Sequence, residues 1–276
     1  MRLFVTGGTG FIGAHFINRV AHNAHEVYAL RRADSRPRIA LKREPNWITG
    51  SLTAPRRGWL DGMDAVVHFA AYGVAESQQD WSEAFRTNLV GTIMLFEAAI
   101  HAGIKTFVVC GSCFEYGSSA AHYKRIPVGA PLRPRGAYAA SKAAASIGML
   151  ALAEEHQLRL TLLRPFHVYG AGEIEPRFFP SMCRAARAGF DFPMTAGEQI
   201  RDFVPVEDVA DRFLQALDHP AQPGRPLVKN VGSGRPQTLL GFAEHWWSKL
   251  GATGKLLPGA VKYRPHEMMR CVPDLR

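Results

Sequence analysis

Long hydrophobic runs and low-complexity tracts are missing from this chain of 276 residues. No uninterrupted apolar stretch reaches the roughly 20 residues that a membrane-spanning helix needs, so we expect no membrane association. Because the first apolar run begins at Leu3, we expect no signal or transit peptide. Because 47% of the residues are hydrophobic, the chain has ample material for a packed core. These features predict a folded, cytoplasmic protein.

Cysteine is scarce as well. Cys110, Cys113, Cys183 and Cys271 are too few for a disulfide scaffold, and their sequence spacing shows no metal-ligand clustering. The sequence therefore predicts a reduced protein without a metal site.

Acidic residues are outnumbered, which gives a net charge of +9. The basic residues are nevertheless scattered, and the densest stretch, Arg31–Arg43, also contains proline and aspartate. Aromatic residues do not alternate with them, so nucleic acid remains a weak alternative and we predict no nucleic-acid partner. Anionic small ligands account for part of the surplus more simply.

Glycine, by contrast, is concentrated near the N-terminus. The apolar run 3–5 predicts a buried strand, residues 6–13 read Thr-Gly-Gly-Thr-Gly-Phe-Ile-Gly, and apolar residues at helical spacing follow. Such a strand–loop–helix junction directs backbone N–H groups and a positive helix end at a diphosphate. Gly7, Gly10 and Gly13 serve the turn, the approach of the diphosphate and helix packing. We predict a dinucleotide site; a glycine-rich turn without a ligand is the alternative.

The end of the second predicted strand, 26–30, bears on the choice of cofactor. A carboxylate there accepts hydrogen bonds from the ribose 2′-hydroxyl of NAD, whereas this strand ends in Arg31 and Arg32. Arginines suit the 2′-phosphate of NADP. NADP(H) is therefore favoured, and Asp34 keeps NAD(H) possible. Two solvated arginines are the alternative interpretation.

Strand-like and helical segments alternate along the chain. Such alternation predicts an α/β fold with a doubly wound parallel sheet, Rossmann-like, whose ligands bind at the carboxyl ends of the strands. After Gly170 the pattern loosens, which indicates a smaller C-terminal substrate-binding lobe. We expect a dinucleotide-binding domain over 1–170, which also receives part of 200–235, and a substrate lobe over 171–276. The further predicted strands are 65–69, 106–110 and 160–163, and the helices are 81–102 and 138–156.

Both of these helices are apolar over more than one stripe. One face covers the sheet, and the remainder predicts a homodimer that buries helices 81–102 and 138–156 as a four-helix interface. A monomer that covers the same surface with loops is the alternative.

Tyr138 and Lys142 are four residues apart on the predicted helix, so both face one ligand. The ammonium favours the phenolate, which makes the tyrosine a usable proton donor or acceptor. Ser112 follows the strand that ends at Cys110 and can hydrogen-bond the same substrate oxygen. By itself the pair also fits a surface contact worth a few tenths of a kcal/mol.

In this order, the motifs resemble the extended short-chain dehydrogenase/reductase family, which includes nucleotide-sugar epimerases, dehydratases and ketoreductases. The likeness runs from residue 2 to about 270 and includes the motifs at 66–71, 88–92, 163–170, 197–203, 206–209, 230–234 and 264–267. It implies a nucleotide-diphosphate sugar as substrate partner. The implied cofactor contacts are Gly7, Thr9, Gly10, Phe11, Ile12, Gly13, Arg31, Arg32, Ser51, Leu52, Phe69, Ala70, Ala71, Asn88, Tyr138, Lys142, Pro165 and His167. The implied substrate contacts are Ser112, Cys113, Phe114, His167, Phe178, Arg201 and Arg264.

The resemblance also implies roles. Tyr138 would exchange a proton with the sugar oxygen, while Lys142 would hold the nicotinamide ribose and lower the pKa of the tyrosine. Where dehydratases of the family carry Asp-Glu, this chain has Cys113-Phe114, so 4,6-dehydration is disfavoured. The segments 167–170 and 197–203 are similar to those of abequose and paratose synthase-like 4-ketoreductases.

The favoured function is therefore NAD(P)H-dependent reduction of the 4-keto group of a nucleotide-linked 4-keto-6-deoxy sugar. An NAD-dependent nucleotide-sugar 4-epimerase uses the same residues and is the first alternative. A non-catalytic dinucleotide-binding sensor or scaffold is the second, although such a protein has no need of a proton relay.

Overall fold

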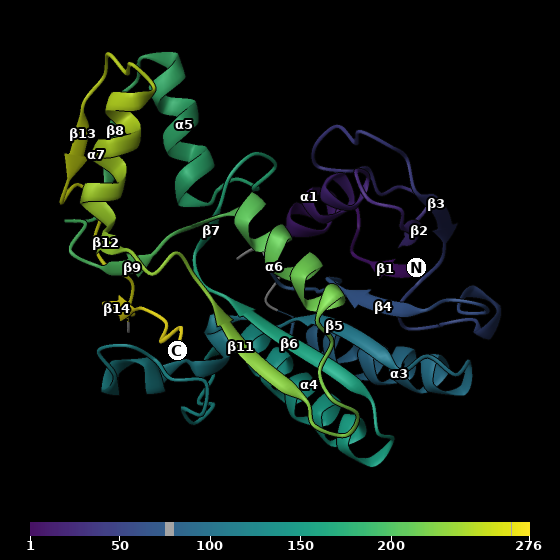
Figure 1. The fold of residues 1–276 in the computed structure, drawn as a ribbon. Helices are drawn as coiled ribbons and strands as arrows, with labels where there is room; N and C mark the ends of the chain where they lie inside the picture. Colours follow the sequence, from purple (N-terminus) through teal and green to yellow (C-terminus); the bar gives the residue numbers. More distant parts are fainter. Residues whose placement is uncertain (75–79, 266) are drawn as a thin grey trace.

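A seven-stranded parallel sheet forms the centre of the computed structural model, which describes residues 1–74, 80–265 and 267–276 (Figure 1). The strand order β11-β6-β5-β4-β1-β2-β3 confirms the predicted doubly wound class. The strands are β1 (Arg2–Thr6), β2 (Glu26–Arg31), β3 (Asn46–Thr49), β4 (Ala65–His68), β5 (Thr106–Cys110), β6 (Arg159–Pro165) and β11 (Leu227–Val231).

Helices cover both faces of this sheet. On one face, α1 (Phe11–Val20) packs on α6 (Val206–Asp218), and their apolar sides bury Phe16 and Phe213 against β1 and β4. On the other face, α3 (Gly91–His101) and α4 (Gly136–Glu155) bury Leu95 and Met149. Two continuous cores therefore fix the sheet from both sides, as alternating strands and helices require.

The predicted helix 81–102 is present with an interruption. It consists of α2 (Trp81–Phe85), the π-helical turn η2 (Arg86–Val90) and α3. The wide turn carries the buried Asn88, whose side chain accepts a hydrogen bond from Tyr72 N (2.7 Å) and donates to Tyr72 O and Ser141 Oγ (both 2.9 Å). Asn88 thus ties the segment after β4 to α4. Periodicity alone does not predict such a turn, because π-turns are local and rare.

The helices α5 (Phe178–Ala188) and α7 (Leu239–Lys249) and several short strands form a second region of the molecule. This second region stands at one end of the sheet, above the carboxyl ends of the strands (Figure 1). These helices pack around Met182, Ala243 and Trp247. Its short strands are β7 (Val168–Tyr169), β8 (Phe192–Met194), β9 (Ile200–Asp202), β10 (Val204–Pro205), β12 (Pro236–Thr238), β13 (Leu256–Pro258) and β14 (Arg270–Cys271). Three short 3₁₀ helices are η1 (Arg57–Trp59), η3 (Cys113–Tyr116) and η4 (Ser118–His122).

Between β10 and β12 the chain returns to the sheet, where α6 covers one face and β11 pairs with β6. β3 is a strand that the sequence pattern did not reveal, since it is only four residues long and has no alternation. Within the described residues, no helix is long and apolar enough to cross a membrane.

Candidate active site

The glycine loop joins β1 to α1 as predicted. Gly7 has φ +70°, and a Cβ placed there would lie 2.5 Å from Ala70 N. A Cβ on Gly13 would lie 2.2 Å from Gly7 O, which itself accepts a hydrogen bond from Gly10 N (2.9 Å). Gly10 caps α1 without any side-chain hydrogen bond, so the first-turn N–H groups remain available to an anion. This cradle, which a side chain would fill, fits a dinucleotide diphosphate.

At the end of β2, Arg31 stacks on Trp47 of β3, with the guanidinium carbon 4.7 Å from the ring centroid. The Nε atom of Arg31 is buried and has no hydrogen-bond partner among the described residues. A buried donor without a partner is costly, and an anionic ligand oxygen would satisfy it. Arg32, the next residue, is exposed. The cation at this strand end fits a dinucleotide, while the preference for NADP stays a prediction.

The resemblance assigns further residues to the cofactor, and these lie around the glycine loop and the carboxyl edge of the sheet. Leu52 is buried against Gly91, whereas Ser51 is exposed and hydrogen-bonds Thr53. Phe69 packs between Phe16 and Phe213 with its ring tilted against both, at centroid distances of 5.3 and 4.6 Å. The remaining predicted contacts lie along the same carboxyl edge: Thr9, Phe11 and Ile12 at the start of α1, Ala70 and Ala71 after β4, and Pro165 at the end of β6.

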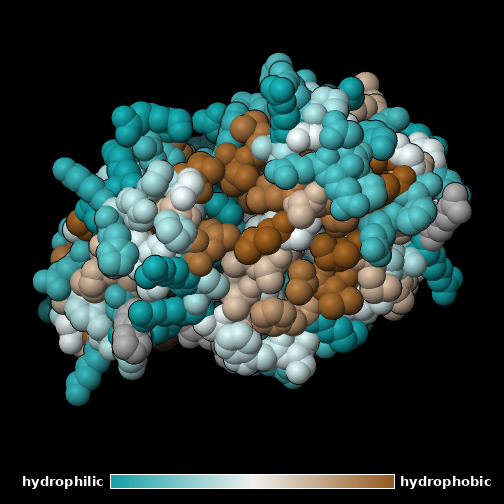
Figure 2. Space-filling view, turned by 90° about the horizontal axis from the view of Figure 1, so that it is seen from below, coloured by the Kyte–Doolittle hydropathy of each residue, from teal (hydrophilic) through white to brown (hydrophobic). Residues whose placement is uncertain are grey.

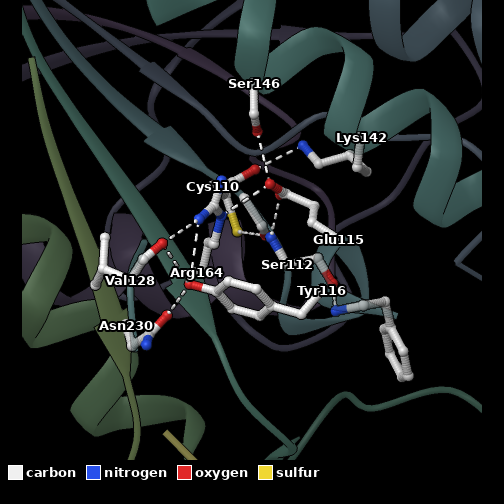
Figure 3. A network of polar contacts seen from close by, with 11 residues as sticks. Cys110, Ser112, Glu115, Tyr116, Val128, Lys142, Ser146, Arg164 and Asn230 are labelled. Atoms are coloured by element: carbon white, nitrogen blue, oxygen red, sulfur yellow. Dashed lines mark hydrogen bonds and ion pairs between the residues drawn. The ribbon is translucent and has the colours of Figure 1, made fainter. Parts of the chain in front are cut away.

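Ser112 follows β5 and caps η3. Its backbone N–H donates to Glu115 Oε1 (2.7 Å), and its hydroxyl accepts from Phe114 N (3.2 Å), which completes a capping box (Figure 3). The Ser-x-x-Glu spacing at 112–115 encodes this turn. The serine hydroxyl is thus held in one place, which a group that binds substrate oxygen requires.

Glu115 in turn belongs to a buried polar network (Figure 3). Its Oε2 accepts from Arg164 Nε (2.8 Å) and Ser146 Oγ (2.9 Å). Arg164 Nη1 donates to the Tyr116 hydroxyl (3.1 Å), which donates to Asn230 Oδ1 (2.7 Å). The network connects η3, α4, β6 and β11, so four elements fix the position of Ser112.

Tyr138 and Lys142 both lie on α4, as the spacing predicts. The expected lowering of the tyrosine pKa by the lysine is wrong for the protein's own residues. Burial raises the pKa of Tyr138, and a hydrogen bond from Ser112 only partly opposes this shift. The Lys142 ammonium donates to Cys110 O (2.6 Å) at the end of β5. The lysine therefore points at the sheet edge, next to the nicotinamide position that the resemblance implies.

A cavity of about 1090 Å³ opens between this edge and the second region. Tyr138 lies on its wall, and the buried Ser112 is close enough to the phenol to act on its pKa. Five predicted substrate residues also line the cavity: Phe114, His167, Phe178, Arg201 and Arg264. The structure thus brings Tyr138 and five of the seven predicted substrate residues to one cavity.

Cys113, like Ser112, is a predicted substrate residue that does not line the cavity. Its side chain is buried beside Cys271 of β14 and is not part of the cavity wall. A hydrogen bond between the two thiols raises the pKa of Cys113 and lowers that of Cys271, with help from His167 and Arg201 for Cys271. The four cysteines are scattered in the sequence, but the fold brings two of them together, because β14 places Cys271 beside Cys113.

Glu173 is a cavity residue that the sequence pattern did not identify. Burial raises its pKa to about 7, and the Arg177 guanidinium, 3.8 Å away, offsets this only in part. The Oε2 atom has no hydrogen-bond partner among the described residues. The only available signal was an acidic residue four positions before an arginine, which is common on protein surfaces.

A doubly wound sheet with a glycine-rich diphosphate cradle and a Ser–Tyr–Lys set at a cavity defines the class of dinucleotide-binding α/β proteins. The sequence model of the NAD dependent epimerase/dehydratase family matches residues 3–232, and the chain belongs to this family. This confirms the resemblance inferred from the motifs.

Known proteins agree with this assignment. The chain is 27% identical to a UDP-glucose 4-epimerase of Lactobacillus helveticus over 268 residues, which cover 88% of this chain and 80% of the relative. The solved structure of MoeE5 in complex with UDP-glucuronic acid and NAD shares 27% identity and a TM-score of 0.85, covering 100% of this chain and 90% of the other. A UDP-N-acetylglucosamine 4-epimerase from Methanobrevibacter ruminantium, at 22% identity, has the same fold (TM-score 0.90, coverage 99% and 89%).

Proposed function

We propose that the chain is an NAD(P)-dependent enzyme that exchanges hydride at C4 of a nucleotide-linked sugar. The observation that carries this proposal is the position of Tyr138. The phenol lies on the cavity wall, hydrogen-bonded to Ser112, at the same sheet edge as the glycine loop. A proton donor, a second hydroxyl and a diphosphate cradle thus surround one crevice.

Each group has a part in the reaction. The dinucleotide, when bound, accepts or supplies the hydride. Tyr138 gives a proton to the sugar oxygen in reduction and takes it in oxidation, and Ser112 shares that oxygen. Lys142 is placed to hold the nicotinamide ribose and to favour the phenolate once the cofactor is present.

The cationic and apolar side chains of the cavity wall suit a nucleotide sugar. Arg201 and Arg264 supply cationic groups for its diphosphate, and Phe114 and Phe178 supply apolar surface for the base or sugar. The solved relative MoeE5 binds UDP-glucuronic acid and UDP-glucose. We infer the same substrate class for this chain, without assigning the base.

For the direction of the reaction, we favour net reduction of a 4-keto-6-deoxy sugar with NADPH. The unpartnered Arg31 Nε at the end of β2 supports a cofactor with an extra phosphate. The second candidate is a 4-epimerase, favoured by the relatives that are named UDP-glucose 4-epimerases. Dehydration is disfavoured, because Cys113 and Phe114 offer no carboxylate pair.

Substitution of the tyrosine tests the proposal. Tyr138→Phe should lower turnover by a factor of about 10² to 10⁴, the usual contribution of general acid–base catalysis, and leave dinucleotide binding intact. NADPH oxidation with a 4-keto sugar nucleotide identifies the reductase, while interconversion of UDP-glucose and UDP-galactose with retained NAD identifies the epimerase. Turnover that is unchanged in Tyr138→Phe would rule out the proposed chemistry.

We also propose that the protein is a cytoplasmic homodimer. The helical face of α2, η2, α3 and α4 exposes Trp81, Val90, Met94 and Ile147. Figure 2, viewed from below the molecule of Figure 1, shows hydrophobic side chains gathered in a band over one face. An apolar surface of this kind favours burial against a second copy. Ile147→Glu should yield a monomer in analytical ultracentrifugation, and a wild-type monomer contradicts this part of the proposal.

A further inference from the structure

Three potential metal ligands from separate parts of the chain meet beside the active site. They are Cys113 on η3, His167 between β6 and β7, and Cys271 on β14. One ligand atom of each residue lies within 4.8 Å of the other two. The exposed fraction of Cys113 is 2% and that of Cys271 is 0%, so both thiols are shielded from solvent.

The side chain of His167 gives a second indication of a bound ligand. Its Nε2 atom is buried and has no hydrogen-bond partner of ordinary length among the described residues, although the ring lies close enough to the Cys271 thiol to lower the pKa of that group. The ring is packed edgewise against Phe114 and tilted against Phe203, with centroids 6.2 and 6.0 Å away. A buried imidazole nitrogen without a partner is destabilising, and a cation bound at its lone pair removes this cost.

We infer that Cys113, His167 and Cys271 bind one thiophilic divalent cation, Zn²⁺, in a tetrahedral site with an open fourth position. Two thiolates and one imidazole are a donor set that zinc prefers. Zn–S bonds of about 2.3 Å and Zn–N bonds of about 2.0 Å place the donors roughly 3.5–3.8 Å apart. Rotation of the cysteine side chains supplies the small contraction that this requires. The inference is independent of the proposed function.

The charges around the site are compatible with such an ion. Two thiolates and a neutral imidazole leave a zinc site without net charge, which suits burial. Arg201 is close enough to act on the charge of Cys271, and its guanidinium is paired with Glu267 at 2.9 Å. His167 also lines the cavity, so a metal and its fourth ligand have access from that side.

A metal here would connect the C-terminal strand to the turn that holds Ser112. It would also occupy the imidazole that the family resemblance assigns to the substrate. A Cys113–Cys271 disulfide is the competing use of the same sulfurs, but it leaves His167 Nε2 unpartnered and needs an oxidant to reach two buried thiols.

The test uses the full chain, reduced with a phosphine, freed of metal by a chelator and titrated with Co²⁺ and then Zn²⁺. We expect one equivalent of Co²⁺ with the intense visible bands of a tetrahedral thiolate site, displaced by Zn²⁺. Cys271→Ser and His167→Gln should each weaken binding by more than about 100-fold, beyond the effect of losing an outer-shell partner. Cys183→Ser, a buried cysteine of α5, is the matched control and should bind normally.

Stability provides a second readout. Zn²⁺ should raise the midpoint of thermal unfolding of the wild type and of Cys183→Ser, and leave that of His167→Gln unchanged. The inference is overturned if reduced wild type binds no metal, if His167→Gln binds it equally well, or if the isolated protein holds a Cys113–Cys271 disulfide and takes up no metal after reduction.

Discussion

The Glu115 carboxylate and the Arg164 guanidinium form a 2.8 Å ion pair whose side chains are 0% and 4% exposed. The pair adjoins the Ser112 turn and makes further hydrogen bonds with Ser112 N, Ser146 and Tyr116. A buried pair of this kind costs desolvation energy, so its value lies in holding one geometry.

Breaking this pair should be strongly destabilising. Glu115→Gln leaves the Arg164 charge buried without a counter-ion, and we expect a loss of about 3–5 kcal/mol in the free energy of unfolding, measured by urea denaturation. Arg184→Met, which removes an exposed ion pair with Glu175, is the control and should cost less than about 1 kcal/mol. A small effect in Glu115→Gln would mean that the network is not a structural support.

The glycine cradle predicts a second effect. Gly13→Ala puts a Cβ 2.2 Å from Gly7 O, so the backbone must move, and we expect about 1–3 kcal/mol of destabilisation together with the loss of dinucleotide binding. At Gly129 a Cβ has nothing within 4 Å, and Gly129→Ala should be neutral. Calorimetric titration with NADP and NAD measures the difference; equal binding by both variants would contradict the placement of the diphosphate.

Glu173 predicts a pH dependence of stability. Its pKa rises from 4.5 to about 7 on folding, so the folded state binds the extra proton between these values. The stabilisation is present below pH 4.5 and is lost as the pH rises through 7. Glu173→Gln has no carboxyl group to titrate, so its stability does not fall in this way. Between pH 5 and pH 8, its free energy of unfolding should rise by roughly 2–3 kcal/mol relative to that of the wild type. Exposed Glu154→Gln should show no such gain; parallel pH profiles would disprove the assignment.

The end of β2 predicts cofactor preference. Arg31→Met removes the guanidinium, and the Kd for NADP should rise about 10- to 100-fold, the worth of one charge-assisted hydrogen bond. Binding of NAD should change little, as should both affinities in Arg36→Met, an exposed arginine beyond the strand. An unchanged Kd for NADP would indicate that Arg31 does not contact the 2′-phosphate and would favour NAD.

Local patterns predicted the central fold well. The run 106–110 is a strand over the predicted bounds, and Tyr138 and Lys142 share one helix, because periodicity and turn residues report local structure directly. The short β3 and the π-turn around Asn88 were missed, since neither leaves a periodic signal.

The sequence predicted the site residues that belong to motifs, but it did not predict the contacts between segments that are far apart in the sequence. The cluster of Cys113, His167 and Cys271 forms because the C-terminal strand β14 brings Cys271 beside Cys113, a long-range contact that sequence spacing does not encode. The pKa of Tyr138 was predicted in the wrong direction, because burial outweighs any effect of Lys142 in the protein alone.

The return of the chain to the sheet between β10 and β12 has a practical consequence for engineering chimeras. α6 and β11 complete the core against α1 and β6, and Arg19 of α1 pairs with Asp211 of α6. A fragment cut after residue 170 would expose both surfaces. Exchanging the second region for that of a relative therefore means replacing two separate stretches, 171–203 and 232–276, while 204–231 is kept as part of the recipient.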